Sequence, residues 1–240
     1  MLISDYRERR ERHCEKIRIL LNFLKEETYS DFKTLMLLFD YKNHKPLYLL
    51  LAKAIDMGFI QKQTFCTRME KISLWGITND GLAAVVTPDE DGFPARFEPA
   101  KITGWTLEHH LDNQLARLIL EKKGAYGWLH GDRPTFRSRY QVKHRPDGTV
   151  IAIETERRLK TKARYQSIIT HHLLARTQKH WMYVFYIVPN PQKKLAIELL
   201  FNSIKHVTVN HQHIPLEAKH RNVFRVYTFE ELKRLALNFD

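Results

Sequence analysis

Apolar residues recur at helical spacing through the first sixty residues of the chain. Between residues 12 and 27 they stand three or four positions apart with charge between them, which predicts an amphipathic helix. A second helix is predicted over residues 31–41, after a capping region at residues 29–31. A third is predicted from Pro46 to Gly58, because proline suits the first position of a helix and glycine its end.

Two runs with strand-like composition follow, at residues 59–66 and 71–78, separated by the polar tip at residues 67–70. Three helices and a β-hairpin predict a winged helix-turn-helix, and the run LWGITNDGLAAV resembles the end of many winged-helix domains. In that layout the third helix reads DNA and the hairpin touches the backbone. The candidate phosphate contacts are Lys42, Lys45, Lys53, Lys62 and Arg68.

Winged helices also serve as protein-interaction modules, and the third helix here is unusually apolar. DNA anchoring is therefore favoured over the reading of base sequence. Residues 87–102 hold several prolines and an acidic cluster with almost no periodicity, which indicates an interdomain linker. The predicted domains are residues 1–94, a winged helix-turn-helix DNA-binding domain, and residues 95–240.

The second half of the chain alternates between helical and strand-like patterns. Helices are predicted at residues 107–123, 157–176, 193–204 and 229–239, and strands at 140–143, 149–156, 181–188, 206–210 and 222–228. This order predicts a mixed sheet with helices on its faces, so that the whole chain belongs to the α/β (α+β) class.

Charge narrows the choice of partner. The chain has 39 Lys and Arg against 27 Asp and Glu, a formal net charge of +12, which favours a polyanion such as nucleic acid. Its two cysteines form no framework, and no signal peptide or membrane-spanning run is apparent, so we expect a cytoplasmic protein.

Three carboxylates gather in one short segment of this basic chain. Side chains alternate along a strand, so Glu154 and Glu156 share one face, about 7 Å apart along it. Asp147, in the preceding turn, can approach them if the chain bends at Gly148. Hard oxygen ligands of this kind suit Mg²⁺ or Mn²⁺.

A basic stripe is predicted beside these carboxylates. If a helix begins at residue 157, then Arg157, Lys160, Arg164 and His171 lie roughly along one side of it. Cations next to a metal and carboxylate cluster can bind phosphate and stabilise the charge that develops during phosphoryl transfer.

The segment resembles the PD-(D/E)-x-K nuclease core: Pro146-Asp147, a short spacer, then Glu154-Thr155-Glu156. The resemblance implies a restriction-endonuclease-like fold, in which Asp147, Glu154 and Glu156 bind the metal. The chain departs from the pattern because Glu156 stands where lysine is usual, as in the E-x-E variant of some restriction enzymes. Lys160 can return the missing amine.

A closer similarity is to the replication-relaxation family and the MobC-type (MOBC) plasmid relaxases. The matching motifs, in order after the winged helix, are His109-His110-Leu111, Trp128, Arg145-Pro146-Asp147-Gly148, Glu154 with Glu156, and Lys160 to Tyr165. The acidic residue usual after the tryptophan is replaced by His130-Gly131-Asp132, so Asp132 is a weaker metal-site candidate. His109, in the first of these motifs, is also a weaker candidate for the site.

The similarity implies metal-dependent nicking of one strand at a plasmid transfer origin, which starts conjugative mobilisation. The implied partners are origin DNA with accessory mobilisation and coupling proteins. A non-catalytic replication initiator or DNA-binding regulator with a degenerate nuclease domain is the alternative.

Three further features are interpreted as structural and not as catalytic or metal-binding. The segment His211-Gln212-His213 is interpreted as a surface loop, and His171-His172 as two helix residues on different faces. Tyr165 can supply a covalent nucleophile, although packing against the sheet is the favoured role.

Overall fold

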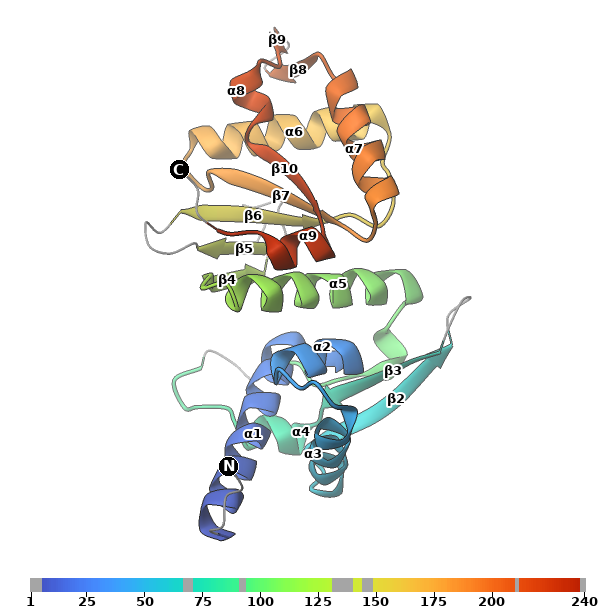
Figure 1. The fold of residues 1–240 in the computed structure, drawn as a ribbon, viewed down its shortest axis with the longest axis vertical. Coiled ribbons are helices and arrows are strands. Elements are labelled where there is room, and N and C mark those ends of the chain that lie inside the picture. Colours follow the sequence, from blue (N-terminus) through green and yellow to red (C-terminus); the bar gives the residue numbers. More distant parts are fainter. Residues whose placement is uncertain are drawn as a thin grey trace. The chain divides into compact units, whose positions relative to one another are not determined.

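The computed structural model describes residues 6–66, 71–90, 94–130, 140–143, 149–209 and 212–237 (Figure 1). Helices combine with sheets of three, five and two strands within these ranges. The predicted α/β (α+β) class is therefore confirmed at this level. No helix among the described residues is long and apolar enough to cross a membrane.

The chain divides into two compact units, Met1–Gln114 and Leu115–Asp240. The division falls inside helix α5 (Gly104–Glu121) instead of after residue 94, where the sequence analysis placed it. The reason lies in the segment expected to be a linker. The Phe97 N–H donates a 2.9 Å hydrogen bond to the Ile77 carbonyl, and the Phe97 ring packs with Leu107 and Leu111 of α5. These contacts bind the start of α5 to the first unit.

A glycine makes room for that ring. A Cβ added at Gly76 would lie 2.0 Å from Cγ of Phe97, well inside van der Waals contact. Gly76 therefore lets the chain after residue 94 close over the hairpin strand.

The first unit begins with a helix, a short strand and two further helices, followed by a hairpin and a short helix. These elements are α1 (Tyr6–Glu27), β1 (Tyr29–Asp31), α2 (Phe32–Leu38), α3 (His44–Asp56), β2 (Ile60–Cys66), β3 (Lys71–Ile77) and α4 (Asn79–Ala83). A single turn of 3₁₀ helix, Pro99–Lys101, precedes α5. The antiparallel sheet has the order β1-β3-β2.

Local capping explains several of these bounds. The Asp31 carboxylate accepts a 2.8 Å hydrogen bond from the Thr34 N–H, which opens α2. Gly58, with a φ of 74°, ends α3 as predicted. That helix begins at His44, two positions before Pro46, and β1 occupies residues expected only to cap a helix.

The second unit is built on a five-stranded mixed sheet of order β10-β7-β6-β5-β4 (Figure 1). Its elements after α5 are β4 (Tyr126–His130), β5 (Tyr140–Lys143), β6 (Val150–Thr155), α6 (Lys162–Thr177), β7 (Tyr183–Val188), α7 (Pro191–Ser203), β8 (His206–Val209), β9 (Gln212–Pro215), α8 (Ala218–Arg221), β10 (Phe224–Thr228) and α9 (Phe229–Arg234). Strands β6, β7 and β10 are parallel, while β4, β5 and β6 are antiparallel.

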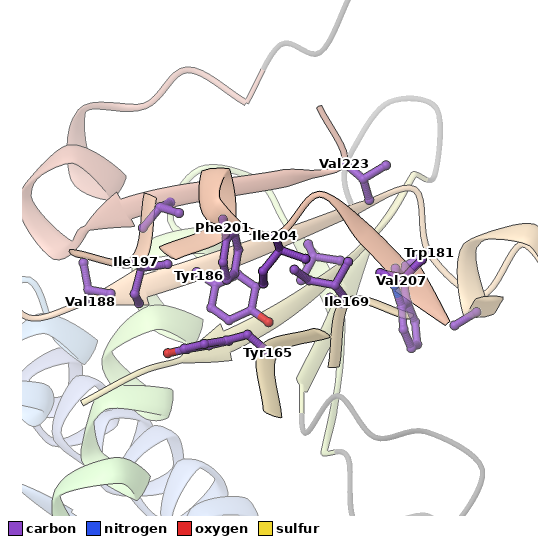
Figure 2. Packing of buried hydrophobic residues seen from close by; sticks show 14 residues of the cluster. Tyr165, Ile169, Trp181, Tyr186, Val188, Ile197, Phe201, Ile204, Val207 and Val223 are labelled. Atoms are coloured by element: carbon purple, nitrogen blue, oxygen red, sulfur yellow. The ribbon is translucent and has the colours of Figure 1, made fainter. Parts of the chain in front are cut away.

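Helices α6 and α7 cover one face of this sheet and form its core with it. Tyr186 of β7 packs with Tyr165 and Ile169 of α6 and with Phe201 of α7 (Figure 2). Ala152 of β6 belongs to the same cluster. The pattern follows from alternation, since every second residue of β6 and β7 points toward these helices.

Three sequence predictions for this unit need correction. Helix α6 starts at Lys162, not at residue 157, because the Thr161 hydroxyl caps it by accepting from the Arg164 N–H. Strand β4 was not predicted. Gln212 and His213 belong to β9, which pairs with β8, so the surface-loop interpretation of these residues was wrong, although both are exposed. His211 lies outside the described residues.

Candidate active site

Two carboxylates lie at the carboxyl end of β6, on the face that α6 covers. In the parallel pairing of β6 with β7, Glu154 stands opposite Tyr186. The Glu156 N–H donates a 2.9 Å hydrogen bond to the Ile187 carbonyl, which extends the pairing one residue beyond β6. Both side chains contact residues of α6 or of the segment before it.

The Glu156 side chain is buried and its charge is matched by two neighbours. Its carboxylate pairs with the Lys160 ammonium and accepts a 3.2 Å hydrogen bond from the Tyr165 hydroxyl. Lys160 Nζ also lies 5.7 Å from the centre of the Tyr165 ring. A buried carboxylate is costly unless such partners compensate it, so these three residues form one structural group.

Glu154 is less enclosed and faces a histidine. Its Oε1 lies 3.4 Å from Nε2 of His172, whose side chain is 2 % exposed, whereas the Glu154 side chain is 24 % exposed. Glu154 is therefore the more accessible of the two carboxylates.

Tyr186 carries a buried hydroxyl that has no hydrogen-bond partner in the described part of the chain. Burial raises its pKa well above the ordinary value, and the charges of Glu154, Tyr165 and Glu156 raise it further. The pKa of Tyr165 is also raised, by burial first and then by Glu156. Both phenols thus remain protonated donors at neutral pH, and Tyr186 has a proton to offer a bound molecule or water.

The remaining predicted site residues are distributed as follows. Asp147, Asp132 and Arg68 lie outside the described residues. Arg157 and Lys160 precede α6, so the predicted helical stripe of Arg157, Lys160, Arg164 and His171 does not form. Arg164 is exposed in the first turn of α6. His109 is half-buried in the part of α5 that belongs to the first unit.

The lysines predicted to contact phosphate are at the surface of the first unit. Lys42 precedes α3, while Lys45 and Lys53 are on it, and all three are exposed. Lys62 of β2 is exposed too, with its Nζ 5.3 Å from the Trp75 ring centre. Cations on one helix and one hairpin strand can reach a phosphate backbone.

Sequence reasoning missed His172. It was passed over as an ordinary helix residue, yet it lies against Glu154. A signal was present in the spacing, because Tyr165, Ile169 and His172 follow one another by four and three positions and share the buried face of α6. A histidine in such a stripe needs a polar partner.

The carboxylates at this site are ligands of the kind that a hard divalent cation prefers, but the described residues supply only two of them. Glu154 and Glu156 supply carboxylate oxygens, the ligands that Mg²⁺ and Mn²⁺ prefer, and the orphaned Tyr186 hydroxyl is at hand for a bound water. Within the described ranges, no three His, Cys, Asp or Glu side chains are gathered as a metal site. A metal held here would need a third ligand, and Asp147, the ligand predicted from the sequence, lies outside the described residues.

Comparison with known proteins found no matching family model, curated protein or solved structure.

Proposed function

We propose that the chain is a metal-dependent DNA endonuclease of the relaxase type, which nicks one strand at a plasmid transfer origin. The observation that carries the proposal is the pair Glu154 and Glu156 at the end of β6, with the Lys160 ammonium against Glu156. The mixed sheet, with β5 and β4 antiparallel to β6 and with α6 leading to parallel β7, supports a restriction-endonuclease-like domain.

Each residue has a chemical role in this proposal. Bound by Glu154, Glu156 and Asp147, Mg²⁺ or Mn²⁺ would supply Lewis acidity and an activated water or hydroxyl nucleophile. Glu154 offers the accessible carboxylate. Lys160 neutralises Glu156 in the free protein, and its half-exposed ammonium can turn to the phosphate, where it stabilises the growing negative charge.

The first unit would anchor the DNA. Its order of three helices and a hairpin supports a winged helix-turn-helix, with Lys45 and Lys53 on the exposed side of α3. In this role the protein acts in the cytoplasm on transfer-origin DNA, together with accessory mobilisation and coupling proteins.

A nicking assay tests the proposal. Supercoiled plasmid carrying the transfer origin is incubated with the purified chain and Mg²⁺ or Mn²⁺, and relaxed product is measured. Glu154→Ala and Asp147→Ala should abolish nicking while DNA binding persists, and Glu217→Gln, at an exposed ion pair with Lys219, serves as the matched control. Full nicking by both alanine variants would falsify the site assignment.

A non-catalytic DNA-binding regulator or replication initiator is the second candidate. It is favoured by one observation: both carboxylates already face basic groups of the chain itself, Lys160 and His172. Wild-type protein that binds origin DNA and never relaxes it with either metal would select this alternative.

A further inference from the structure

The first turns of α1 stand clear of the core of the first unit. Every residue from Tyr6 to Lys16 is exposed or half-buried, and Ile17 is the first buried residue of the helix. This end of α1, in dark blue, projects from the rest of the first unit (Figure 1). Core packing does not explain these turns, so their charged surface is the feature that a partner would meet.

One side of this segment is electrically balanced by its own ion pairs. Nε of Arg7 lies 3.2 Å from Oε1 of Glu11, and Nη2 of Arg18 lies 3.0 Å from Oε2 of Glu15. These four residues follow one another by three or four positions, so they form one row along the helix. The row holds two cations and two carboxylates and has no net charge.

A second row, on another side of α1, carries only positive charge. It consists of Arg9, Arg12 and Lys16, and at about 100° per residue it lies about 140° around the helix from the first row. Within the described ranges, neither Arg12 nor Lys16 takes part in an ion pair. Glu8, four positions before Arg12, is exposed and forms no ion pair with a described residue. The charges of Arg12 and Lys16 can therefore meet an anion from outside the chain.

This basic row continues toward the surface that is proposed to bind DNA. Nζ of Lys16 lies 5.1 Å from the centre of the Tyr41 ring. Lys42 follows that tyrosine directly, and both Lys42 and Lys45 at the start of α3 are exposed. Lys16 thus connects the basic row of α1 with the lysines before and on α3.

The chemistry of the row selects its partner. Arg12 and Lys16 are about 6 Å apart along the helix axis, since each residue advances about 1.5 Å, and phosphates along one strand of a duplex are spaced at about 3.4 Å. Both side chains can therefore reach phosphates of the same strand. Residues 6–16 have no repeating apolar stripe of the kind that enters a membrane or forms a coiled coil with a second copy.

We infer that the basic row of α1 is a second contact for the phosphate backbone of duplex DNA. The inference rests on the proposed function, because it extends the DNA-anchoring surface of the first unit beyond α3 and the hairpin. Arginine and lysine side chains in such a contact bind by charge and set the register of the protein on the duplex without reading bases.

Salt titrations test the inference without relying on cleavage. Labelled duplex DNA that lacks the transfer origin is titrated with the whole chain in the absence of divalent metal. Arg12→Ala and Lys16→Ala should each reduce the slope of log K against log salt by about 1, and the double variant by about 2. At about 0.1 M salt, each single variant should bind about 5- to 10-fold more weakly.

Arg18→Ala is the matched control, because it removes the same charge from the row that is already paired. Its slope should equal that of the wild type. A wild-type slope in the double variant of Arg12 and Lys16 overturns the inference.

Lys16→Arg separates charge from packing. It keeps the cation beside Tyr41, so its slope should return to that of the wild type. A slope that falls in Lys16→Arg as far as in Lys16→Ala shows that the contact with the ring matters and the charge does not, which overturns the role of Lys16.

Two other partners are distinguished by the same variants. If the double variant changes the self-association of the free protein in sedimentation, while its duplex affinity is unchanged, the row contacts a second copy and the inference fails. The titration is also repeated with single-stranded RNA. A slope change on RNA alone overturns the assignment to duplex DNA.

The inference and the proposed function can fail separately. If the chain nicks origin plasmid and the double variant keeps the wild-type slope, the proposed function stands and the α1 contact is lost. If the chain never nicks and the slope of the double variant falls by about 2, the catalytic proposal fails and the α1 contact stands.

Discussion

The Tyr165 hydroxyl donates a 3.2 Å hydrogen bond to the Glu156 carboxylate, nine residues earlier in the chain. Tyr165 stands in the first turn of α6 and Glu156 directly follows β6, so this bond joins the helix to the sheet. Lys160, in the connection between them, adds the compensating charge. The turn that carries the candidate chemistry is thus also a structural joint.

Removal of Lys160 should destabilise this joint. Lys160→Met leaves the buried Glu156 carboxylate without its cation, and we expect the free energy of unfolding to fall by about 1–3 kcal/mol. In a double-mutant cycle with Glu156→Gln, the two changes should show a coupling of about 1 kcal/mol in urea unfolding. Lys162→Met, two residues on and exposed, should have little effect. Coupling near zero would contradict the buried pair.

The hydroxyls of Tyr186 and Tyr165 should give opposite results when removed. Tyr186→Phe deletes a buried hydroxyl that has no partner among the described residues, so the unfolding free energy should rise by about 1 kcal/mol in metal-free protein. Tyr165→Phe deletes a donor to Glu156 and should lower it by about 1 kcal/mol. Urea titrations of both variants provide the comparison, and changes of the same sign would show that Tyr186 has a hidden partner.

Tyr29 should make the first unit sensitive to alkali. Burial, and then the charge of Glu27, raises its pKa to about 12, above its ordinary value near 10. The folded state therefore keeps the Tyr29 proton that the unfolded state loses, and the resulting stability is present below about pH 10 and lost as pH rises through about 12.

Removing this phenol should flatten the alkaline response. Between about pH 10 and 12, Tyr29→Phe should lose about 1–2 kcal/mol less unfolding free energy than the wild type, after allowance for the partial exposure of Tyr29. Tyr48→Phe, at a phenol that is 54 % exposed, is the control and should follow the wild type. Parallel curves for Tyr29→Phe and the wild type would argue against the raised pKa.

Thr28 adopts a strained backbone conformation that glycine should relieve. Its φ is 68°, which is rare for a β-branched residue, and its N–H donates to the Leu24 carbonyl at 2.7 Å. Thr28→Gly should raise the unfolding free energy by about 0.5–1 kcal/mol. The backbone strain that glycine removes from the folded state outweighs the entropy that it adds to the unfolded chain. Lys33→Gly, inside α2, should lower it by about 0.5–1 kcal/mol in the same thermal unfolding assay. A loss of stability in both variants would show that Thr28 is not strained.

Salt dependence should reveal the phosphate contacts of α3. Each of Lys45→Ala and Lys53→Ala should reduce the slope of log K against log salt for duplex DNA by about 1, the expected effect of one lost phosphate contact. Lys101→Ala, which removes an exposed partner of Glu98, should leave the slope unchanged. Unaltered slopes in both α3 variants would place the DNA on another surface.

Periodicity predicted the elements whose buried faces are continuous. The apolar run that became β7 and the residues that became α1 were visible from spacing alone, because each buries a regular set of side chains. Strand β4 carries no such run, and its pairing with β5 depends on residues ten or more positions away. Local pattern contains no information on a strand of that kind.

The candidate site was predictable only in its acidic half. Alternation along β6 put Glu154 and Glu156 on one face, and both contact residues on the α6 side of the sheet. The basic half depended on where α6 begins, and the Thr161 cap moved that start past Arg157 and Lys160. The partnership of His172 with Glu154 joins residues eighteen positions apart through the packing of helix on sheet, which no spacing rule specifies.

Strand β10 lies next to β7 at one edge of the five-stranded sheet, and it follows the other four strands of that sheet in the sequence. During synthesis the ribosome releases the strands of the first unit well before residues 224–228. We therefore expect the first unit to fold while the chain is still growing, and the second to wait for its final strand. Until then β7 has an open backbone edge, and the nascent chain is most exposed to pairing with other chains in that interval.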